Sequence, residues 1–272
     1  MNTTSTTLRP GLCSITLRQL PIGDVIETSI RAGVEGIEWG SDVHVPVGDA
    51  NAAAEARARC DDAGIEVVSY GSYFGMQRVE ADAATAMNAI LDMTEMLGAP
   101  MVRIWTEFGI SPESPAEDRA RVSGITAAFA AAAATRDLLV ALEFHPWCLT
   151  HTAASAVALL DDIAAPNLLT HWQPDPTIPS DLARAELRTV LPRLAHVHTF
   201  FWGPGGINER HPLADGEALW RPLLFDTAHA AVRAPLRGRF ALLEYVRDDA
   251  PEQFVEDVAT LRRWLTEVEA RP

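Results

Sequence analysis

The sequence is poor in cysteine, in positive charge and in long apolar runs. Its 272 residues contain three cysteines, Cys13, Cys60 and Cys148, with no CxxC spacing, which excludes a disulfide framework and favours reduced thiols. The 22 basic residues against 37 acidic ones give a net charge of −15, which disfavours nucleic acid as a partner because its phosphates would be repelled. No apolar run reaches the length of a membrane span, and residues 1–9 lack the apolar segment of a signal peptide. We therefore expect a cytoplasmic protein without a membrane partner.

Short apolar runs alternate with longer amphipathic runs from one end of the chain to the other. Eight strand–helix units, with no linker or change of composition between them, predict an α/β protein that closes into a single (β/α)8 barrel. The barrel domain is expected to span residues 1–272, with residues 1–9 as a disordered tail. Strands are predicted to begin near Gly11, Val34, Ile65, Met101, Leu138, Leu168, Leu194 and Arg239.

Three of the intervening helices carry clear start or stop signals. The apolar stripe over residues 22–30 ends at Gly33, and the stripe over residues 87–97 ends at Gly98, because glycine accepts the left-handed conformation that terminates a helix. The last helix is predicted to open near Asp249, where proline and glutamate follow in the first turn.

Charged and histidine residues gather where the predicted strands end. Glu143 and Glu244 each close a buried apolar run, and His198 closes another. A buried carboxylate is costly unless a cation pairs with it, so one divalent ion shared by both glutamates is the expected partner. Catalytic groups of this barrel collect at the C-terminal strand ends. Other residues at these exits are Glu38, His44, Arg103, Trp105, His145, His171 and Gln173.

Tryptophan shows the same bias toward strand ends, at Trp39, Trp105, Trp147, Trp172 and Trp202. Indole faces beside carboxylates suit the C–H faces of a sugar, and the alternative is that these rings only plug the barrel mouth. His196 lies deeper in its strand and is interpreted as an interior histidine. Arg103 is either a substrate clamp or an interior ion-pair partner of Glu38.

These segments together resemble the xylose isomerase-like TIM barrels, the sugar phosphate isomerase/epimerase family. The resemblance runs over nearly the whole chain and implies an enzyme that acts on a small carbohydrate. Family members often form dimers or tetramers, which implies a homo-oligomer by analogy. The matching segments, in order, are residues 36–39, 42–46, 142–145, 172–174, 196–198, 211–216 and 243–245.

The resemblance also implies one divalent metal ion, Mn, Mg or Co rather than Zn. Carried over by position, its ligands are Glu143, Gln173, His198 and Glu244. The sixth strand of the family usually supplies Asp where this chain has Gln173, so we expect weaker binding and a more electrophilic ion, with Asp175 as a nearby substitute ligand. Glu143 and Glu244 are implied as the catalytic pair that moves a proton through an enediolate. Residues expected to contact the substrate are His44, Arg103, Trp105, His145, Trp172, Arg210 and His211.

Several functions remain compatible with these residues. The first is a metal-dependent isomerase or epimerase acting on a ketose or related polyol ketone. The second is a lyase or dehydratase that acts by β-elimination on a keto-sugar, a keto-inositol or an oxidised glycoside, and the third is a non-catalytic sugar-binding barrel. A DNA repair enzyme like endonuclease IV is disfavoured, because residues 67–70 offer no metal ligand and the net charge is −15.

Overall fold

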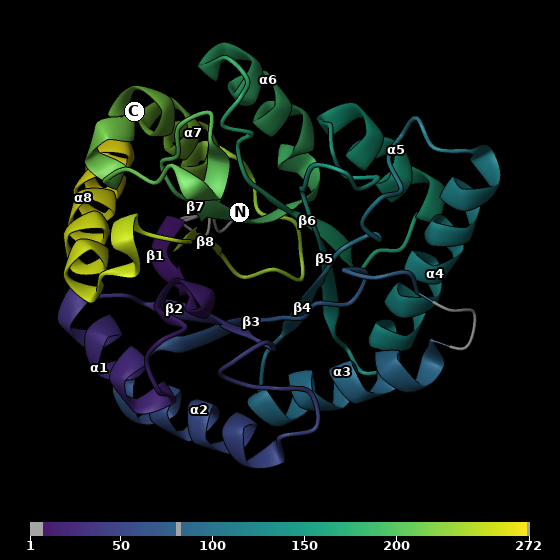
Figure 1. Cartoon of the computed structure of the whole chain (residues 1–272), viewed down its shortest axis with the longest axis horizontal. Coiled ribbons are helices and arrows are strands. Elements are labelled where there is room, and N and C mark those ends of the chain that lie inside the picture. The colour runs from purple at the N-terminus through teal and green to yellow at the C-terminus, as the bar shows by residue number, and fades with distance from the viewer. Residues whose placement is uncertain (1–7, 80–82, 271–272) are drawn as a thin grey trace, which may run out of the picture.

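The computed structural model describes residues 8–79 and 83–270, which form a closed barrel of eight parallel strands inside a ring of eight α-helices (Figure 1). Each strand pairs with its neighbours in chain order, and β8 closes the barrel against β1. The predicted fold class, a single (β/α)8 barrel, is therefore confirmed. Within the described residues, no helix is both long enough and apolar enough to cross a membrane.

The strands occupy the positions that the apolar runs predict. The starts at Met101, Leu168, Leu194 and Arg239 are confirmed. The predicted tail is wrong for residues 8–9, which open the first strand, while residues 1–7 lie outside the described part of the chain. The strands are β1 (Leu8–Cys13), β2 (Gly36–Gly40), β3 (Glu66–Gly71), β4 (Met101–Ile104), β5 (Leu139–Glu143), β6 (Leu168–Trp172), β7 (Leu194–Thr199) and β8 (Arg239–Leu243).

The helices end where the sequence signals them. Gly33 and Gly98 take left-handed conformations, with φ of 79° and 74°, and terminate the first and third helices. The last helix starts at Pro251, two residues after the predicted Asp249. The helices are α1 (Ile22–Ala32), α2 (Ala50–Ala63), α3 (Ala84–Leu97), α4 (Ala116–Ala134), α5 (Ala153–Ile163), α6 (Ser180–Val190), α7 (Glu217–His229) and α8 (Pro251–Glu269).

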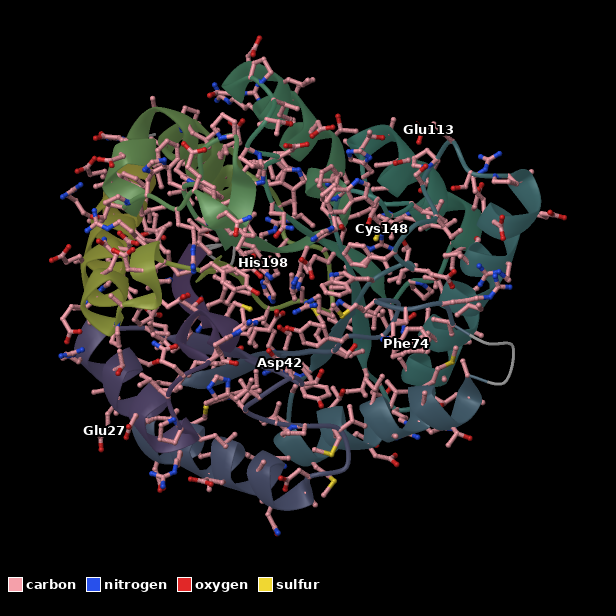
Figure 2. The ribbon with its side chains drawn as sticks, in the orientation of Figure 1. Glu27, Asp42, Phe74, Glu113, Cys148 and His198 are labelled. Atoms are coloured by element: carbon pink, nitrogen blue, oxygen red, sulfur yellow. The ribbon has the colours of Figure 1, made fainter. Side chains whose placement is uncertain are left out.

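The barrel interior is separate from the main core. Outward-facing strand residues pack with the helices into one large apolar cluster, because successive side chains of a strand point to opposite faces. A smaller cluster, which includes Met101, Leu139 and Leu169, contains strand residues alone and forms an apolar floor inside the barrel. Polar interior residues follow further along the same strands: Arg103 on β4, Glu143 on β5, and His171 and then Gln173 on and after β6. His198 accordingly lies near the centre of the ring of helices (Figure 2).

Candidate metal centre

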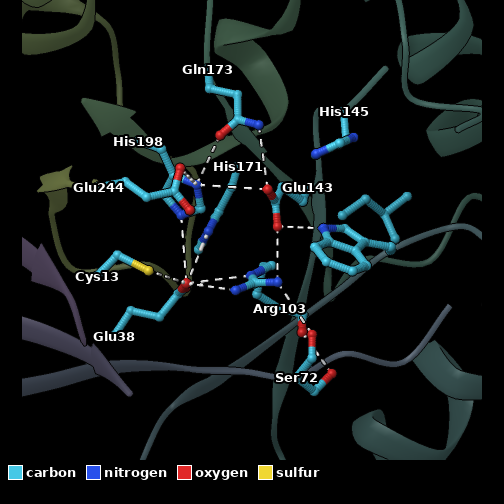
Figure 3. Close-up of polar contacts among 12 residues, drawn as sticks. Cys13, Glu38, Ser72, Arg103, Glu143, His145, His171, Gln173, His198 and Glu244 are labelled. Carbon is cyan, nitrogen blue, oxygen red and sulfur yellow. Dashed lines mark hydrogen bonds and ion pairs between the residues drawn. The ribbon is translucent and has the colours of Figure 1, made fainter. Parts of the chain in front are cut away.

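Four neighbouring strand ends bring one polar side chain each to a common point (Figure 3). Glu143 ends β5, Gln173 follows β6, His198 lies on β7 and Glu244 follows β8. Ligand atoms of Glu143, His198 and Glu244 lie within 4.8 Å of one another. His198 Nδ1 is 3.6 Å from Glu244 Oε2 and 4.0 Å from Glu143 Oε1. The four residues expected as a ligand set are thus together and buried.

Gln173 connects two members of this set through its amide group. Its Nε2 donates to Glu143 Oε1 at 3.3 Å, and its Oε1 accepts a hydrogen bond from His198 Nδ1 at 3.1 Å. The amide therefore stands in the ligand set without adding a charge. Asp175, the expected substitute, instead accepts hydrogen bonds from the backbone N–H and the hydroxyl of Thr177 in the following loop. The expectation that Asp175 replaces Gln173 is wrong.

Arg103 bridges two buried glutamates. Its Nη1 is 2.9 Å from Glu143 Oε2, and its Nη2 is 3.2 Å from Glu38 Oε1. Nη1 also donates to the carbonyl of Ser72, and the side chain is only 4% exposed. The interior ion pair with Glu38 is therefore confirmed, and a substrate contact of Arg103 stays a prediction. Glu143 has a guanidinium partner besides the expected metal ion, because adjacent strands β4 and β5 point both side chains inward.

The two catalytic candidates have different surroundings. Glu143 Oε2 accepts a hydrogen bond from Trp105 Nε1 at 2.5 Å besides its pairing with Arg103, so this carboxylate is held from one side. Among the residues that the structure describes, Glu244 contacts His198 but no guanidinium. Burial raises the pKa of Glu244 to about 7, with a smaller upward contribution from Glu143 that His198 and Arg103 oppose.

The cluster carries an excess of buried negative charge. Three carboxylates, Glu38, Glu143 and Glu244, against one guanidinium, Arg103, leave a formal charge of −2 when His198 is neutral and of −1 when it is protonated. Burial alone would lower the pKa of His198, yet the carboxylates of Glu244 and Glu38 raise it to about 9. Two carboxylates, an imidazole and an amide oxygen are ligands that divalent ions such as Mn²⁺ accept, and such an ion would balance the charge. The residues therefore fit the metal that the sequence resemblance implies.

An aromatic wall stands beside Glu143. The ring of Trp105 lies 5.6 Å from His145 and 4.9 Å from Phe108, and Trp147 lies 6.4 Å from both His145 and Phe108. His145 Nδ1 contacts the carbonyl of Pro146 at 2.8 Å, which orients the imidazole. Trp105 and His145 are thus close to the candidate metal centre, and their contact with a substrate stays a prediction.

Two expected substrate contacts are wrong. Trp172 is fully buried in the main core, 6.3 Å from the ring of Phe144, because it alternates with the inward-facing His171 and Gln173 and therefore points outward. His44 is buried, and its two ring nitrogens bond to the hydroxyl of Ser14 and a backbone carbonyl. Both ring nitrogens of His44 are thus engaged, and the indole nitrogen of Trp172, which has no hydrogen-bond partner among the described residues, is buried in the core. Trp39 is also in the core, so the five tryptophans do not form one cleft.

Arg210 and His211 lie in the loop between β7 and α7. The guanidinium of Arg210 pairs with both carboxylate oxygens of Asp249, at 2.5 and 3.1 Å, and lies 5.8 Å from the ring of Tyr245. His211 is partly exposed and lies 3.5 Å from Glu209. Because Tyr245 directly follows Glu244, Arg210 stands at the barrel mouth. Substrate contacts of Arg210 and His211 stay predictions.

The sequence reasoning missed two interior residues. Cys13 Sγ donates to Glu38 Oε1 at 3.4 Å, and Ser69 Oγ donates to Glu38 Oε2 at 2.5 Å. Both are fully buried. The available signal was their position: Cys13 ends β1, and Ser69 pairs with Glu38 in the register of β2 and β3.

Because Trp172 points outward into the core, its removal is predicted to destabilise the fold. Trp172→Ala is expected to lower the free energy of unfolding by about 3–5 kcal/mol, because it leaves a large cavity in the core. Trp147→Ala is the matched control: this indole is 65% exposed, and its loss is expected to change stability by less than about 0.5 kcal/mol. Urea unfolding of both variants measures the difference. Equal losses would place Trp172 outside the core.

Comparisons with known proteins agree on the architecture. A family model described as xylose isomerase-like TIM barrel matches residues 26–264. The sequence matches no protein of curated function. A 3-keto-D-glucoside 4-epimerase from E. coli is 18% identical, with a TM-score of 0.71 over 94% of this chain and 99% of that one.

Two further solved structures are similar over almost their whole length. A probable 3-DHS dehydratase from Bacillus anthracis is 16% identical, with a TM-score of 0.71 over 94% of this chain and 99% of that one. A xylose isomerase-like TIM barrel protein from Mycobacterium smegmatis, solved in complex with magnesium, is 16% identical, with a TM-score of 0.69 over 97% of this chain and 98% of that one. At these identities the likeness concerns the fold alone.

Proposed function

The chain belongs to the xylose isomerase-like TIM barrel family, and we propose that it is a metal-dependent isomerase or epimerase acting through an enediolate on a ketose or related polyol ketone. The observation that carries the proposal is the cluster of Glu143, His198 and Glu244, whose ligand atoms lie within 4.8 Å of one another inside the barrel mouth. Two carboxylates that face one point supply both metal ligands and proton-transfer groups. The partner is then a small carbohydrate.

The metal would be held by Glu143 Oε1, Gln173 Oε1, His198 Nδ1 and a carboxylate oxygen of Glu244. When bound, a divalent ion polarises adjacent carbonyl and hydroxyl oxygens of a sugar and acidifies the neighbouring C–H. Mn, Mg and Co suit this oxygen-rich set better than Zn. The neutral amide of Gln173 contributes no charge, so weaker binding is expected than with an aspartate.

The two glutamates are suited to different parts of the proton transfer. They come from β5 and β8, which are not neighbours in the barrel, so they approach a bound substrate from different directions. Glu244, with its pKa near 7, is suited to take and return a proton at neutral pH. Glu143 is oriented by Arg103 and Trp105, and the indole of Trp105 offers an apolar face for the sugar C–H groups.

Solvent-exchange measurements test this proposal directly. The protein is incubated with Mn²⁺ and a series of ketoses in deuterated water, and the products are followed by NMR and mass spectrometry. The expected result is deuterium at the carbon next to the carbonyl, with no loss of water or of another leaving group. The absence of label with every divalent ion and ketose in the series would contradict the proposal.

A β-eliminating lyase is the second candidate, and the position of His145 favours it. This imidazole stands beside Trp105 near Glu143, with one ring nitrogen fixed by Pro146, so its other nitrogen is placed to protonate a leaving group. In that reaction the C–H proton is removed as before, the bond to the β-oxygen breaks, and the leaving hydroxyl or alcohol takes a proton. Substrates would be keto-sugars, keto-inositols or oxidised glycosides. Release of water or alcohol in the same experiment identifies this reaction.

Metal binding is predicted to release protons in a pH-dependent number. His198, with a pKa of about 9, and Glu244, with a pKa of about 7, must both lose their protons to ligate an ion. About two protons should therefore leave at about pH 6 and about one at about pH 8, so affinity falls as the pH falls. Calorimetric titration with Mn²⁺ in buffers of different ionisation enthalpy measures this number. If no divalent ion binds, a non-catalytic sugar-binding barrel is favoured instead.

A further inference from the structure

A second group of ligating atoms, here called the lower site, lies on the other side of His198, around Glu38 (Figure 3). Ligand atoms of Cys13, Glu38 and His198 lie within 4.8 Å of one another, and all three side chains are fully buried. Cys13 Sγ is 3.4 Å from Glu38 Oε1, and His198 Nε2 is 3.5 Å from the same oxygen. Ligand atoms around a tetrahedral zinc ion, bound at about 2.0–2.3 Å, are about 3.3–3.8 Å apart.

Unpaired ring nitrogens mark the same place. Within the described part of the chain, His198 Nε2 and both ring nitrogens of His171 make no hydrogen bond, although they are buried. His171 Nδ1 lies 3.5 Å from Glu38 Oε2, so both imidazoles face the carboxylate of Glu38. Buried polar atoms are almost always paired, and several unpaired ones around one carboxylate indicate a missing partner. A metal ion that replaces the protons of these groups and accepts electron pairs from nitrogen and sulfur is such a partner.

Gln173 determines which nitrogen of His198 can bind such an ion. The amide nitrogen of Gln173 donates to Glu143, so its carbonyl oxygen faces His198 Nδ1. A carbonyl oxygen only accepts hydrogen bonds, so Nδ1 must carry a proton. The proton that a cation can replace is then the one on Nε2, which faces Glu38 and Cys13. The side-chain amide of Gln173 thus leaves Nε2 of His198 as the nitrogen that faces Glu38 and Cys13.

We propose that Cys13, Glu38 and His198 Nε2 form a second metal site, which takes a thiophilic divalent ion such as zinc or cobalt, with His171 as the nearest further donor. As the metal–sulfur and metal–nitrogen bonds form, the Cys13 thiol and His198 Nε2 each lose a proton to solvent. The thiolate and Glu38 then supply two negative charges for the ion, and Arg103 stays paired with both Glu38 and Glu143. Soft thiolate and imidazole ligands distinguish this lower site from the oxygen-rich upper site, which is formed by Glu143, Gln173, His198 Nδ1 and Glu244.

The two sites compete for one imidazole. A neutral histidine has one ring nitrogen free to bind a metal, and the upper site needs Nδ1 of His198 whereas the lower site needs Nε2. A thiophilic ion in the lower site therefore prevents binding of Mn²⁺ or Mg²⁺ above it and inhibits the enzyme. The lower site stands independently of the proposed function, but this inhibition rests on it.

Cobalt titration tests the lower site, because a cobalt–thiolate bond gives an intense near-ultraviolet charge-transfer absorption that oxygen and nitrogen ligands do not give. The band is expected in the wild-type protein, in Cys60→Ser and in Cys148→Ser, and it is expected to disappear in Cys13→Ser. If Cys13→Ser does not fold, survival of the band in both control variants still assigns it to Cys13. Cobalt binding without the band, or a band that survives in Cys13→Ser, overturns the proposal.

Electron paramagnetic resonance of added Mn²⁺ tests the competition. As cobalt is added to the manganese-loaded protein, free Mn²⁺ should increase in proportion to the thiolate band. A full band with Mn²⁺ still bound would show two independent sites and overturn the competition. The outcomes also separate the two proposals. Solvent exchange without a thiolate band supports the proposed enzymatic function and contradicts the lower site. A thiolate band without solvent exchange under any metal supports the lower site and contradicts the enzymatic function.

Discussion

Glu244→Gln is expected to reduce solvent-deuterium exchange into a ketose by about 10²- to 10⁴-fold, the usual contribution of a general acid or base. The substitution keeps the shape and hydrogen-bonding capacity of the side chain but removes the group that takes the proton. It also removes a negative charge from a cluster in which three carboxylates face one guanidinium and one imidazole. Stability should therefore stay the same or rise slightly. Exchange is measured by NMR with Mn²⁺ well above its dissociation constant, so that weaker binding does not mimic lost chemistry.

Glu143→Gln provides the internal comparison for that result. It should also lower the exchange rate, but it removes a partner of Arg103 and an acceptor for Trp105, so stability should fall as well. Glu66→Gln, at a carboxylate that is about half exposed, should change neither exchange nor Mn²⁺ binding. If Glu244→Gln exchanges protons at the wild-type rate with Mn²⁺ bound, Glu244 is not the group that transfers the proton.

The convergence of the metal ligands could be predicted from the sequence because it depends on two simple regularities. The carboxyl ends of parallel strands in a barrel meet at one face, and alternate residues of a strand share a direction. Glu143 and His198 end buried runs, and Glu244 directly follows one. The structure then needs no unusual local geometry to bring their side chains together.

The same alternation, applied more strictly, excludes Trp172 from the mouth. It lies between His171 and Gln173, which face inward, and a shift of one residue along a strand reverses the face. Its position at a strand end gave the wrong prediction because the ends of strands are marked in the sequence more clearly than their faces. The polar residues His171 and Gln173 on either side of Trp172 mark the inward face, and they indicate that Trp172 points outward.

The charge partners could not be predicted in the same way. Arg103 contacts Glu38 on β2 and Glu143 on β5, and the choice of partners depends on the register of strands that are distant in sequence. Cys13 is similar, since its place beside Glu38 follows only once β1 is known to end there. These contacts decide how the buried charge is balanced, and hence how strongly an ion is attracted.

Arg103→Met should therefore have a large effect on stability, a loss of about 3–5 kcal/mol in the free energy of unfolding, because it leaves buried charges unpaired. Both its glutamate partners are at most 4% exposed. Arg31→Met is the matched control, since Arg31 and its partner Glu252 are 53% and 76% exposed, and it should cost about 0–1 kcal/mol. Urea unfolding with a chelator present, at about pH 8, gives both values without a contribution from bound metal.

The pH dependence shows whether charge is the cause. Burial alone would raise the pKa of Glu38, but Arg103 and His198 hold it well below its usual value. In the wild type, Glu38 therefore stabilises the fold above the unfolded pKa of about 4.3, and this contribution is lost as the pH falls through the lower folded pKa. Without Arg103 the folded pKa rises, and Glu38 can take a proton in the fold. The difference in the free energy of unfolding between the wild type and Arg103→Met should thus become smaller below about pH 5. A difference that does not change with pH would mean that lost packing, and not charge, destabilises the variant.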